Sequence, residues 1–184
     1  MAKIIENGIV YNDSKTKILG YTKDIPSVLT IPDSVESIGD DAFYRCARLK
    51  SVTIGKSVKI IGSWAFGFCE SLTSIKIPDS VTSLGNYAFN GCSKLKSVTI
   101  ENGVTSIGRF AFEGCYNLTS ITIPDSVTSI GDLAFAYCDN LTSITIPDSV
   151  TRIGYEAFWG CIRLTSITIP DGATVIGRRI FLNN

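Results

Sequence analysis

The chain has 184 residues, and 45% of them are hydrophobic, which is typical of a globular protein rather than a disordered or collagen-like one. Lysine plus arginine and aspartate plus glutamate each number 17, so the chain lacks the positive charge of most nucleic-acid-binding proteins, and no nucleic-acid partner is expected. The absence of histidine excludes Ser-His-Asp and Cys-His catalysis and any histidine-ligated metal. Because the apolar runs are too short to cross a membrane, no membrane insertion is expected.

The first 33 residues are predicted to form an N-terminal cap and a first repeat-like strand. Residues 1–8 contain no sustained apolar stretch, so no signal peptide is expected. Ile4-Ile5 and Ile9-Val10-Tyr11 flank Asn7-Gly8, a dipeptide typical of tight β-hairpin turns. We therefore expect a β-hairpin cap within residues 1–33, ending in a strand at residues 28–33.

Residues 34–171 consist of six copies of a 23-residue repeat. The unit reads S-V-T-S-I-G-x-x-A-F-x-x-C-x-x-L-T-S-I-T-I-P-D, and its glycine, phenylalanine, cysteine and leucine columns all keep the same spacing. A unit of this length cannot bury its apolar residues alone, whereas stacked copies can. We therefore predict a solenoid with a parallel sheet along one side.

Each repeat is predicted to contain a short strand, a turn and one helical turn. In one central copy, Leu118, Ile121 and Ile123 are separated by polar residues, a spacing typical of a strand with one buried face. A Pro-Asp turn follows this strand. Asp132 is then placed to cap a single helical turn that carries the Ala-Phe and Cys of the motif. Capping residue types also occupy this position at Asp40, Ser63 and Asn86.

The run L-x-x-I-x-I-P followed by V-x-x-I-G-x-x-A-F-x-x-C resembles the BspA-like, or treponemal-class, leucine-rich repeat family. The resemblance covers the chain from Pro26 to its end. It implies a curved leucine-rich repeat solenoid of the α/β type, dominated by β-structure, with the strands on the concave face and the A-F-x-x-C half on the other side. It also implies interaction rather than catalysis, because many members look like surface adhesins. Two copies depart from the motif, at Gly55-Lys56 and Glu101-Asn102, and their turns are expected to differ.

The six cysteines fall in one column of the repeat, at Cys46, Cys69, Cys92, Cys115, Cys138 and Cys161. Neighbouring repeats are close enough for disulfides, but stacked equivalent side chains point the same way, so their sulfur atoms do not face each other. Zinc binding is disfavoured because its ligands must converge. We therefore expect a ladder of buried thiols beneath the leucines.

The strand positions that face away from the predicted core carry an unusually uniform set of hydroxyl groups. They include Ser97, Thr99, Ser120, Thr122, Ser143 and Thr145. Serine and threonine are ordinary residues for a solvated strand face. The alternative is a binding surface for an extended partner, a glycan or, with least support, ice.

The variable positions around the Ala-Phe and Cys are expected to be exposed, because packing holds the apolar columns nearly constant. Aromatic side chains recur among them, and exposed aromatic residues with arginine nearby are typical anchors of interfaces. The alternative is that their rings only cover the helical side. The candidate partner-binding residues are Tyr44, Phe68, Tyr116, Tyr137 and Trp159. Positions between the Gly and Ala of the motif add Trp64, Tyr87, Phe110 and Tyr155.

Residues 172–184 form a C-terminal half-repeat that lacks the cysteine and the following strand. Ile176, Ile180 and Phe181 continue the apolar columns with no strand to cover them; Arg178 and Arg179 add charge, and Leu182 lies beyond them. The sequence therefore predicts a weak homo-oligomer formed through this end.

The sequence favours a protein-interaction module, used for adhesion to or recognition of a protein partner such as a host matrix or cell-surface protein. No enzyme activity or cofactor is expected, because the glycines recur singly instead of forming a phosphate-binding loop. The alternatives are a purely structural or engineered consensus-like scaffold and, less favoured, carbohydrate or ice binding by the Ser/Thr face. The resemblance suggests a cell-surface or secreted location, although residues 1–8 do not read as a signal peptide.

Overall fold

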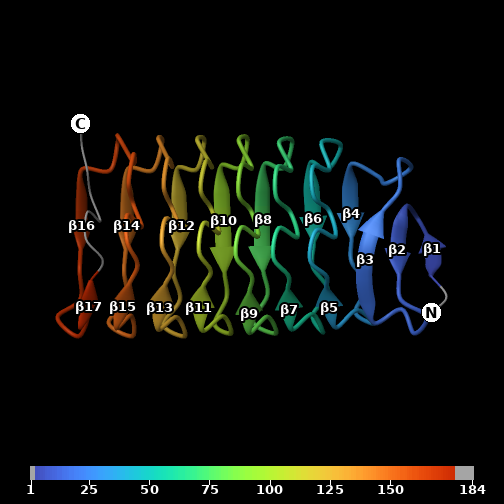
Figure 1. The fold of residues 1–184 in the computed structure, drawn as a ribbon, viewed down its shortest axis with the longest axis horizontal. Helices are drawn as coiled ribbons and strands as arrows, with labels where there is room; N and C mark the ends of the chain where they lie inside the picture. The colour runs from blue at the N-terminus through green and yellow to red at the C-terminus, as the bar shows by residue number, and fades with distance from the viewer. Residues whose placement is uncertain (1–2, 177–184) are drawn as a thin grey trace.

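The computed structural model describes residues 3–176, which form an elongated solenoid of stacked repeats (Figure 1). Each turn of the solenoid contributes one longer and one shorter strand, and strands of each kind stack in parallel. The longer strands come from the S-I-T part of the motif. They are β4 (Val28–Thr30), β6 (Ser51–Thr53), β8 (Ser74–Ile77), β10 (Ser97–Ile100), β12 (Ser120–Thr122), β14 (Ser143–Thr145) and β16 (Ser166–Thr168).

The shorter strands come from the two residues before the motif's glycine. They are β5 (Ser37–Ile38), β7 (Ile60–Ile61), β9 (Ser83–Leu84), β11 (Ser106–Ile107), β13 (Ser129–Ile130), β15 (Arg152–Ile153) and β17 (Val175–Ile176).

Identical positions of successive repeats pair in register, as the sequence predicts. Ser97 pairs with Ser120, for example, and Thr99 with Thr122. In β12 and β14 the central isoleucine points inward, so the flanking serine and threonine point to solvent. We call the outer side of these longer strands the strand face.

The N-terminal residues add antiparallel strands to only one of the two stacks. β1 (Ile4–Glu6) and β2 (Ile9–Tyr11) form a hairpin around Asn7 and Gly8, both of which have positive φ. β3 (Lys17–Tyr21) pairs with β2 and, in parallel, with β5 of the solenoid. The Tyr21 ring stacks on Phe43, with ring centroids 6.3 Å apart, and so covers the end of the core.

The third side of the solenoid carries the A-F-x-x-C half of each repeat, and we call it the turn side. The predicted single helical turn is wrong: within residues 3–176 the structure contains turns here and no helix. Two residues of each repeat on this side, four positions apart, have positive φ, such as Trp64 and Phe68. Helical residues all have negative φ, so these two residues prevent a helix from forming.

The backbone of the turn side also forms its own set of hydrogen bonds between repeats. The amide of Phe66 donates to the carbonyl of Ala88 at 2.8 Å, and the amide of Phe68 donates to Asn90 at 2.7 Å. The intervening amide of Gly67 donates to Trp64 within its own turn. Every second amide therefore points along the solenoid, and a helix would lose these bonds because it uses its amides locally.

The predicted helix caps also have a different role. The Oδ1 atom of Asp132 accepts a hydrogen bond from the amide of Tyr155, 2.9 Å away in the next repeat. Asp40 and Asn86 accept the equivalent bonds from Ser63 and Arg109, respectively. These side chains join neighbouring repeats instead of ending a helix.

The core is a set of ladders, of which the phenylalanine ladder is the largest. Phe112 is fully buried between Phe89 and Phe135, with centroid distances of 5.4 Å to both and nearly parallel rings. This arrangement confirms the position predicted for Phe112. Offset-stacked rings at such distances add stabilisation beyond the area that they bury.

The predicted ladder of buried thiols is also confirmed, because all six cysteines are free and buried. The sequence did not reveal what the sulfur atoms contact. The thiol of Cys92 donates to the carbonyl of Phe66 at 3.1 Å, and that of Cys115 donates to Phe89 at 3.3 Å. Burial raises the pKa of both thiols, which disfavours the reactive thiolate.

Neither stack of strands is continuous. The longer strands separate into β4 to β12 and the pair β14–β16, while the shorter strands separate between β9 and β11. The break between β9 and β11 comes after Glu101-Asn102, which stands where the motif has Pro-Asp. Glu101 forms an ion pair with Lys76 at 2.7 Å. Gly103 lies so close to the carbonyl oxygen of Asp79 that a Cβ atom there would be 2.0 Å from it. The residues named for C-terminal self-association, 178–182, lie outside the described part of the chain.

Replacing Phe112 with alanine should destabilise the protein by about 3–5 kcal/mol, because it opens a cavity inside the stacked rings. Denaturant unfolding of the variant and the unmodified chain measures this loss. Phe110→Ala is the matched control: its ring is half-buried on the turn side, so its loss should be less than half as large. A loss below about 1 kcal/mol for Phe112→Ala would contradict the stacked core.

The thiols should be protected in the folded protein. A thiol reagent should react slowly with the native chain, because the sulfur atoms are buried and the pKa of Cys92 and Cys115 is raised. After unfolding without reductant, six groups should react. A lower number in the unfolded chain would reveal disulfides.

Candidate interaction surfaces

The turn side carries a ladder of half-exposed aromatic rings in the N-terminal half of the solenoid. Trp64 stacks on Tyr87 with centroids 4.2 Å apart, and Tyr87 stacks on Phe110 at 4.6 Å. In both pairs the rings are parallel to within 5°. The sequence placed these three residues in variable positions, but it did not show that they stack.

Two of the five candidate anchors, Tyr44 and Phe68, extend this ladder. The Tyr44 ring meets Trp64 edge-on at 5.6 Å and Phe68 at 5.9 Å. The Arg45 guanidinium carbon lies over both rings, 5.3 Å from the Tyr44 centroid and 5.8 Å from that of Phe68. We call the whole cluster the aromatic face; it comprises Tyr44, Trp64, Phe68, Tyr87 and Phe110.

The backbone of the turn side holds these rings in place. Trp64, Phe68, Tyr87 and Phe110 all have φ between 55° and 59°, a region that bulky residues rarely adopt. The amide of each donates a hydrogen bond of 2.7–3.0 Å to the next repeat, which offsets the strain. Gly91 leaves room for the Phe68 ring, since a Cβ atom at this position would be 2.5 Å from a ring carbon.

The other three anchors lie in the C-terminal half, separate from the aromatic face. Tyr137 and Trp159 meet edge-on with centroids 4.7 Å apart, and Gly160 provides room for the Tyr137 ring. Tyr116 is 48% exposed and makes no ring contact within residues 3–176. The structure therefore does not bring the five anchors together into one surface.

A polar pair lies between the two aromatic groups. The amide nitrogen of Asn90, a residue only 6% exposed, donates to the Oε2 atom of Glu113 at 2.7 Å. Burial raises the pKa of Glu113 from its ordinary value of 4.5, and the hydrogen bond opposes this shift. Nothing in the sequence indicated this pair, because both residues occupy a position that changes from repeat to repeat.

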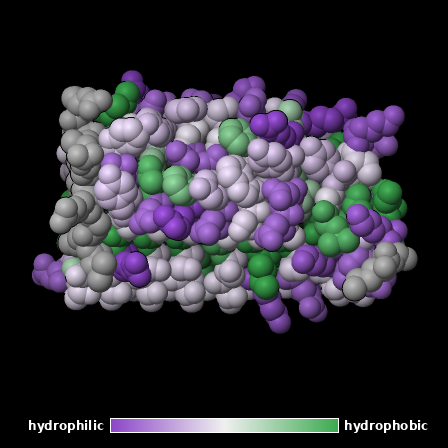
Figure 2. Space-filling view, in the orientation of Figure 1, coloured by the Kyte–Doolittle hydropathy of each residue, from purple (hydrophilic) through white to green (hydrophobic). Residues whose placement is uncertain are grey.

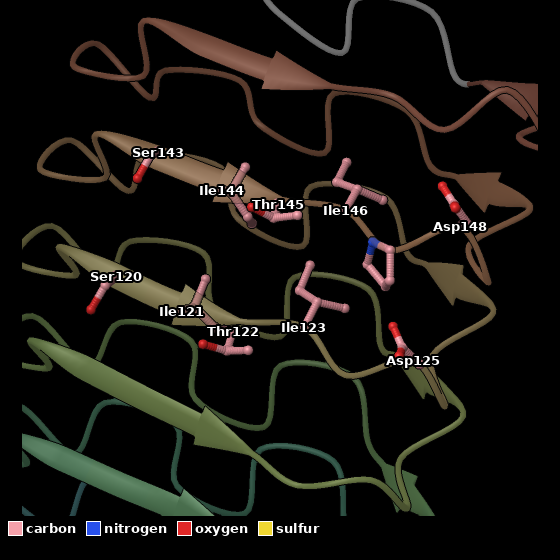
Figure 3. A pocket seen from close by; sticks show the side chains of 11 residues that line it. Ser120, Ile121, Thr122, Ile123, Asp125, Ser143, Ile144, Thr145, Ile146 and Asp148 are labelled. Carbon is pink, nitrogen blue, oxygen red and sulfur yellow. The ribbon is translucent and has the colours of Figure 1, made fainter.

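The strand face presents the predicted hydroxyl array to solvent. Ser97, Thr99 and the equivalent residues of β12 and β14 are all exposed. Where β12 and β14 are no longer joined, a shallow groove runs between Ser120 and Ser143 at one end and Asp125 and Asp148 at the other (Figure 3). Isoleucine side chains and Pro147 line the groove together with serine, threonine and aspartate side chains.

The surface seen from the direction of Figure 1 has no large continuous apolar area. Polar and weakly polar residues dominate it, and apolar residues appear in separate small groups (Figure 2). Within residues 3–176 no cluster of three or more histidine, cysteine, aspartate or glutamate residues is placed to hold a metal ion. The same residues contain no helix of the length and apolarity needed to cross a membrane.

The family model for the BspA type leucine-rich repeat region matches residues 21–142 and 128–184, with six copies of the repeat. The chain belongs to this family. The resemblance seen in the sequence is therefore confirmed, and the leucine-rich repeat solenoid agrees with it. Repeat proteins of this kind are generally non-enzymatic modules for protein interaction or surface recognition. A search of curated proteins finds no match.

Solved structures of other leucine-rich repeat proteins share this fold. A leucine-rich repeat protein from Eubacterium ventriosum is 29% identical, with a TM-score of 0.89 over 95% of this chain and 48% of its own. A leucine rich cell surface protein from Faecalibacterium prausnitzii is 37% identical, with a TM-score of 0.73 over 91% of this chain and 54% of its own. The leucine-rich repeat protein of T. pallidum is 26% identical, with a TM-score of 0.69 over 84% and 86%. This chain thus spans about half the length of the first two proteins.

Glu113 should make the stability of this BspA-type repeat protein depend on pH. Burial raises its pKa, so the folded state favours the protonated form, and the stability that this contributes at acid pH is lost as the pH rises through the raised pKa. Glu113→Gln removes the charge and keeps an oxygen that accepts the Asn90 hydrogen bond. The free energy of unfolding of the variant minus that of the unmodified chain should therefore be more positive at pH 7 than at pH 4. Urea unfolding at both pH values tests this, and equal differences would contradict it.

Proposed function

We propose that this leucine-rich repeat protein recognises a protein partner through the aromatic face. The observation that carries the proposal is the packing of five half-exposed rings beside Arg45 on one side of the solenoid. Aromatic residues and arginine are the residue types most enriched among energetically important interface contacts.

The rigidity of the turn side supports this role. Side chains that are already ordered before binding lose little conformational freedom in a complex. Trp64 is held by stacking on Tyr87, and Phe68 is held by its contacts with Trp64 and Tyr44. The aromatic face therefore presents a large contact area at a small entropic cost.

We further propose that the recognition takes place at a cell surface, as in adhesion. The Faecalibacterium prausnitzii relative, 37% identical over 91% of this chain, is described as a cell surface protein. The anchors Tyr116, Tyr137 and Trp159 would then serve as a secondary contact region farther along the same side.

The strand face is a second candidate, because the groove between β12 and β14 lies within the hydroxyl array. Ser120, Thr122, Ser143 and Thr145 line it, and Asp125 and Asp148 close one end. Such a groove suits a polar extended ligand, including a glycan. No aromatic ring lines it, however, and this weakens the case for a sugar-stacking site.

The two surfaces can be distinguished by binding the labelled full chain to immobilised extracellular-matrix proteins and to whole epithelial cells. Tyr44→Ala and Phe68→Ala should each weaken binding about tenfold, equivalent to about 1.4 kcal/mol. Ser120→Ala and Thr122→Ala are matched controls on the strand face and should bind like the unmodified chain. The reverse pattern would move the site to the strand face, and absence of binding to every protein and cell would count against adhesion.

A further inference from the structure

The two stacks of strands end differently at the N-terminal end of the solenoid. The stack of shorter strands continues past β5 through β3, β2 and β1, whereas the stack of longer strands stops at β4. In Figure 1, β2 and β1 lie beyond β4 along the solenoid axis. β4 is therefore an edge strand, and the projecting hairpin forms a ledge beside it.

The edge of β4 presents unused backbone groups. The amide of Ser51 donates to the carbonyl of Ser27, and the amide of Ile31 donates to the carbonyl of Thr53. Backbone groups alternate sides along a parallel strand, so residues 27, 29 and 31 face β6 while Val28 and Thr30 face outward. Within the described chain, the amide and carbonyl groups of Val28 and Thr30 have no hydrogen-bond partner.

The side chains around this edge leave it accessible. Val28 is 66% exposed, an unusual position for a valine, and Thr30 is also exposed. A cavity of about 630 Å³ adjoins the edge. Leu29 lies at its buried side, and the other lining residues are Asn7, Gly8, Asp24, Pro26 and Thr30.

We propose that this edge binds an extended segment of a partner protein, which adds a strand to the stack next to β4. Exposed strand edges are templates for such addition, and main-chain hydrogen bonds supply the affinity. The site lies at the end of the solenoid and does not use the aromatic face, so it is independent of the function proposed above.

The pairing within the solenoid indicates which segments fit. Leu29 lies beside Val52, and Val28 and Thr30 lie beside Ser51 and Thr53. A segment that pairs with the free edge of β4 in this register runs parallel to β4. It has an aliphatic residue between two polar ones, as in Ser-Ile-Thr. Its aliphatic side chain then enters the cavity beside Leu29, and its polar side chains lie next to Val28 and Thr30.

Pairing between the β4 edges of two copies of this protein fits less well. Two β4 strands that paired with each other would bring two projecting hairpins to the same end of the solenoid. Each β2–β1 ledge would then have to clear the other molecule. A single extended segment has no such bulk and lies along the ledge.

The probe for this site is a labelled, acetylated peptide of residues 117–125 of this chain, Asn-Leu-Thr-Ser-Ile-Thr-Ile-Pro-Asp, which contains the strand pattern. Two matched versions carry N-methyl groups, one at Ile121 and Ile123 and the other at Ser120 and Thr122. In the parallel register, the isoleucine amides face β4 and the other two face solvent. We expect the plain peptide and the Ser/Thr-methylated peptide to bind the full chain in fluorescence anisotropy, and the Ile-methylated peptide to bind at least tenfold more weakly.

A chain variant tests the same edge from the other side. Thr30→Pro removes an outward amide that bonds nothing in the solenoid, and proline is tolerated on strand edges. It should weaken peptide binding at least tenfold, while Thr30→Val, which keeps the amide, should bind normally. Thermal unfolding verifies that both variants fold, and the methylated peptides decide the matter if Thr30→Pro does not.

Three results would overturn the proposal. One is equal binding of the two methylated peptides, because strand addition uses only one set of amides. Another is unchanged binding to a folded Thr30→Pro chain. The third is a dimer in sedimentation that Thr30→Pro disperses, because the edge would then be occupied by a second copy.

Discussion

The backbone hydrogen bond between successive repeats is the interaction on which the whole structure depends. It joins the strands of both stacks, and it recurs on the turn side, where the amide of Phe112 donates to the carbonyl of Ala134. Side chains add to it: the threonine hydroxyl of Thr128 donates to the carbonyl of Thr105 at 3.1 Å. Because each bond requires the same backbone path in both repeats, it enforces the constant 23-residue spacing.

This constraint divides the positions of the repeat into two classes. Residues that point inward must match their neighbours, which gives the stacked phenylalanines and the thiols that bond to backbone carbonyls. Residues that point outward are free to vary, and the left-handed positions of the turn side hold large rings such as Trp64 and Tyr87 half-exposed at the surface. The framework is thus rigid and its outer surface is variable, a combination that suits a binding module.

The same bonds create the problem of the ends. A stack of strands leaves unpaired amide and carbonyl groups wherever it stops, and such groups must be covered or used. The N-terminal hairpin covers one stack, and Tyr21 covers the phenylalanine ladder, but β4 remains open. An interruption within the stack, as between β12 and β14, has a related effect, because a groove lined by both polar and apolar side chains lies there.

The sequence by itself determined the repeat, the parallel stacking, the buried Phe112 and the buried cysteines, because a column that recurs every 23 residues becomes a ladder in any stacked arrangement. Only the tertiary structure decided the conformation of the turn side. Asp132 looks like a helix cap in one repeat, and its actual partner, Tyr155, is 23 residues away. Likewise, the stacking of Trp64 on Tyr87, the Asn90–Glu113 pair and the open edge of β4 arise between repeats. Local propensity does not report contacts of this kind, because it describes each repeat without its neighbours.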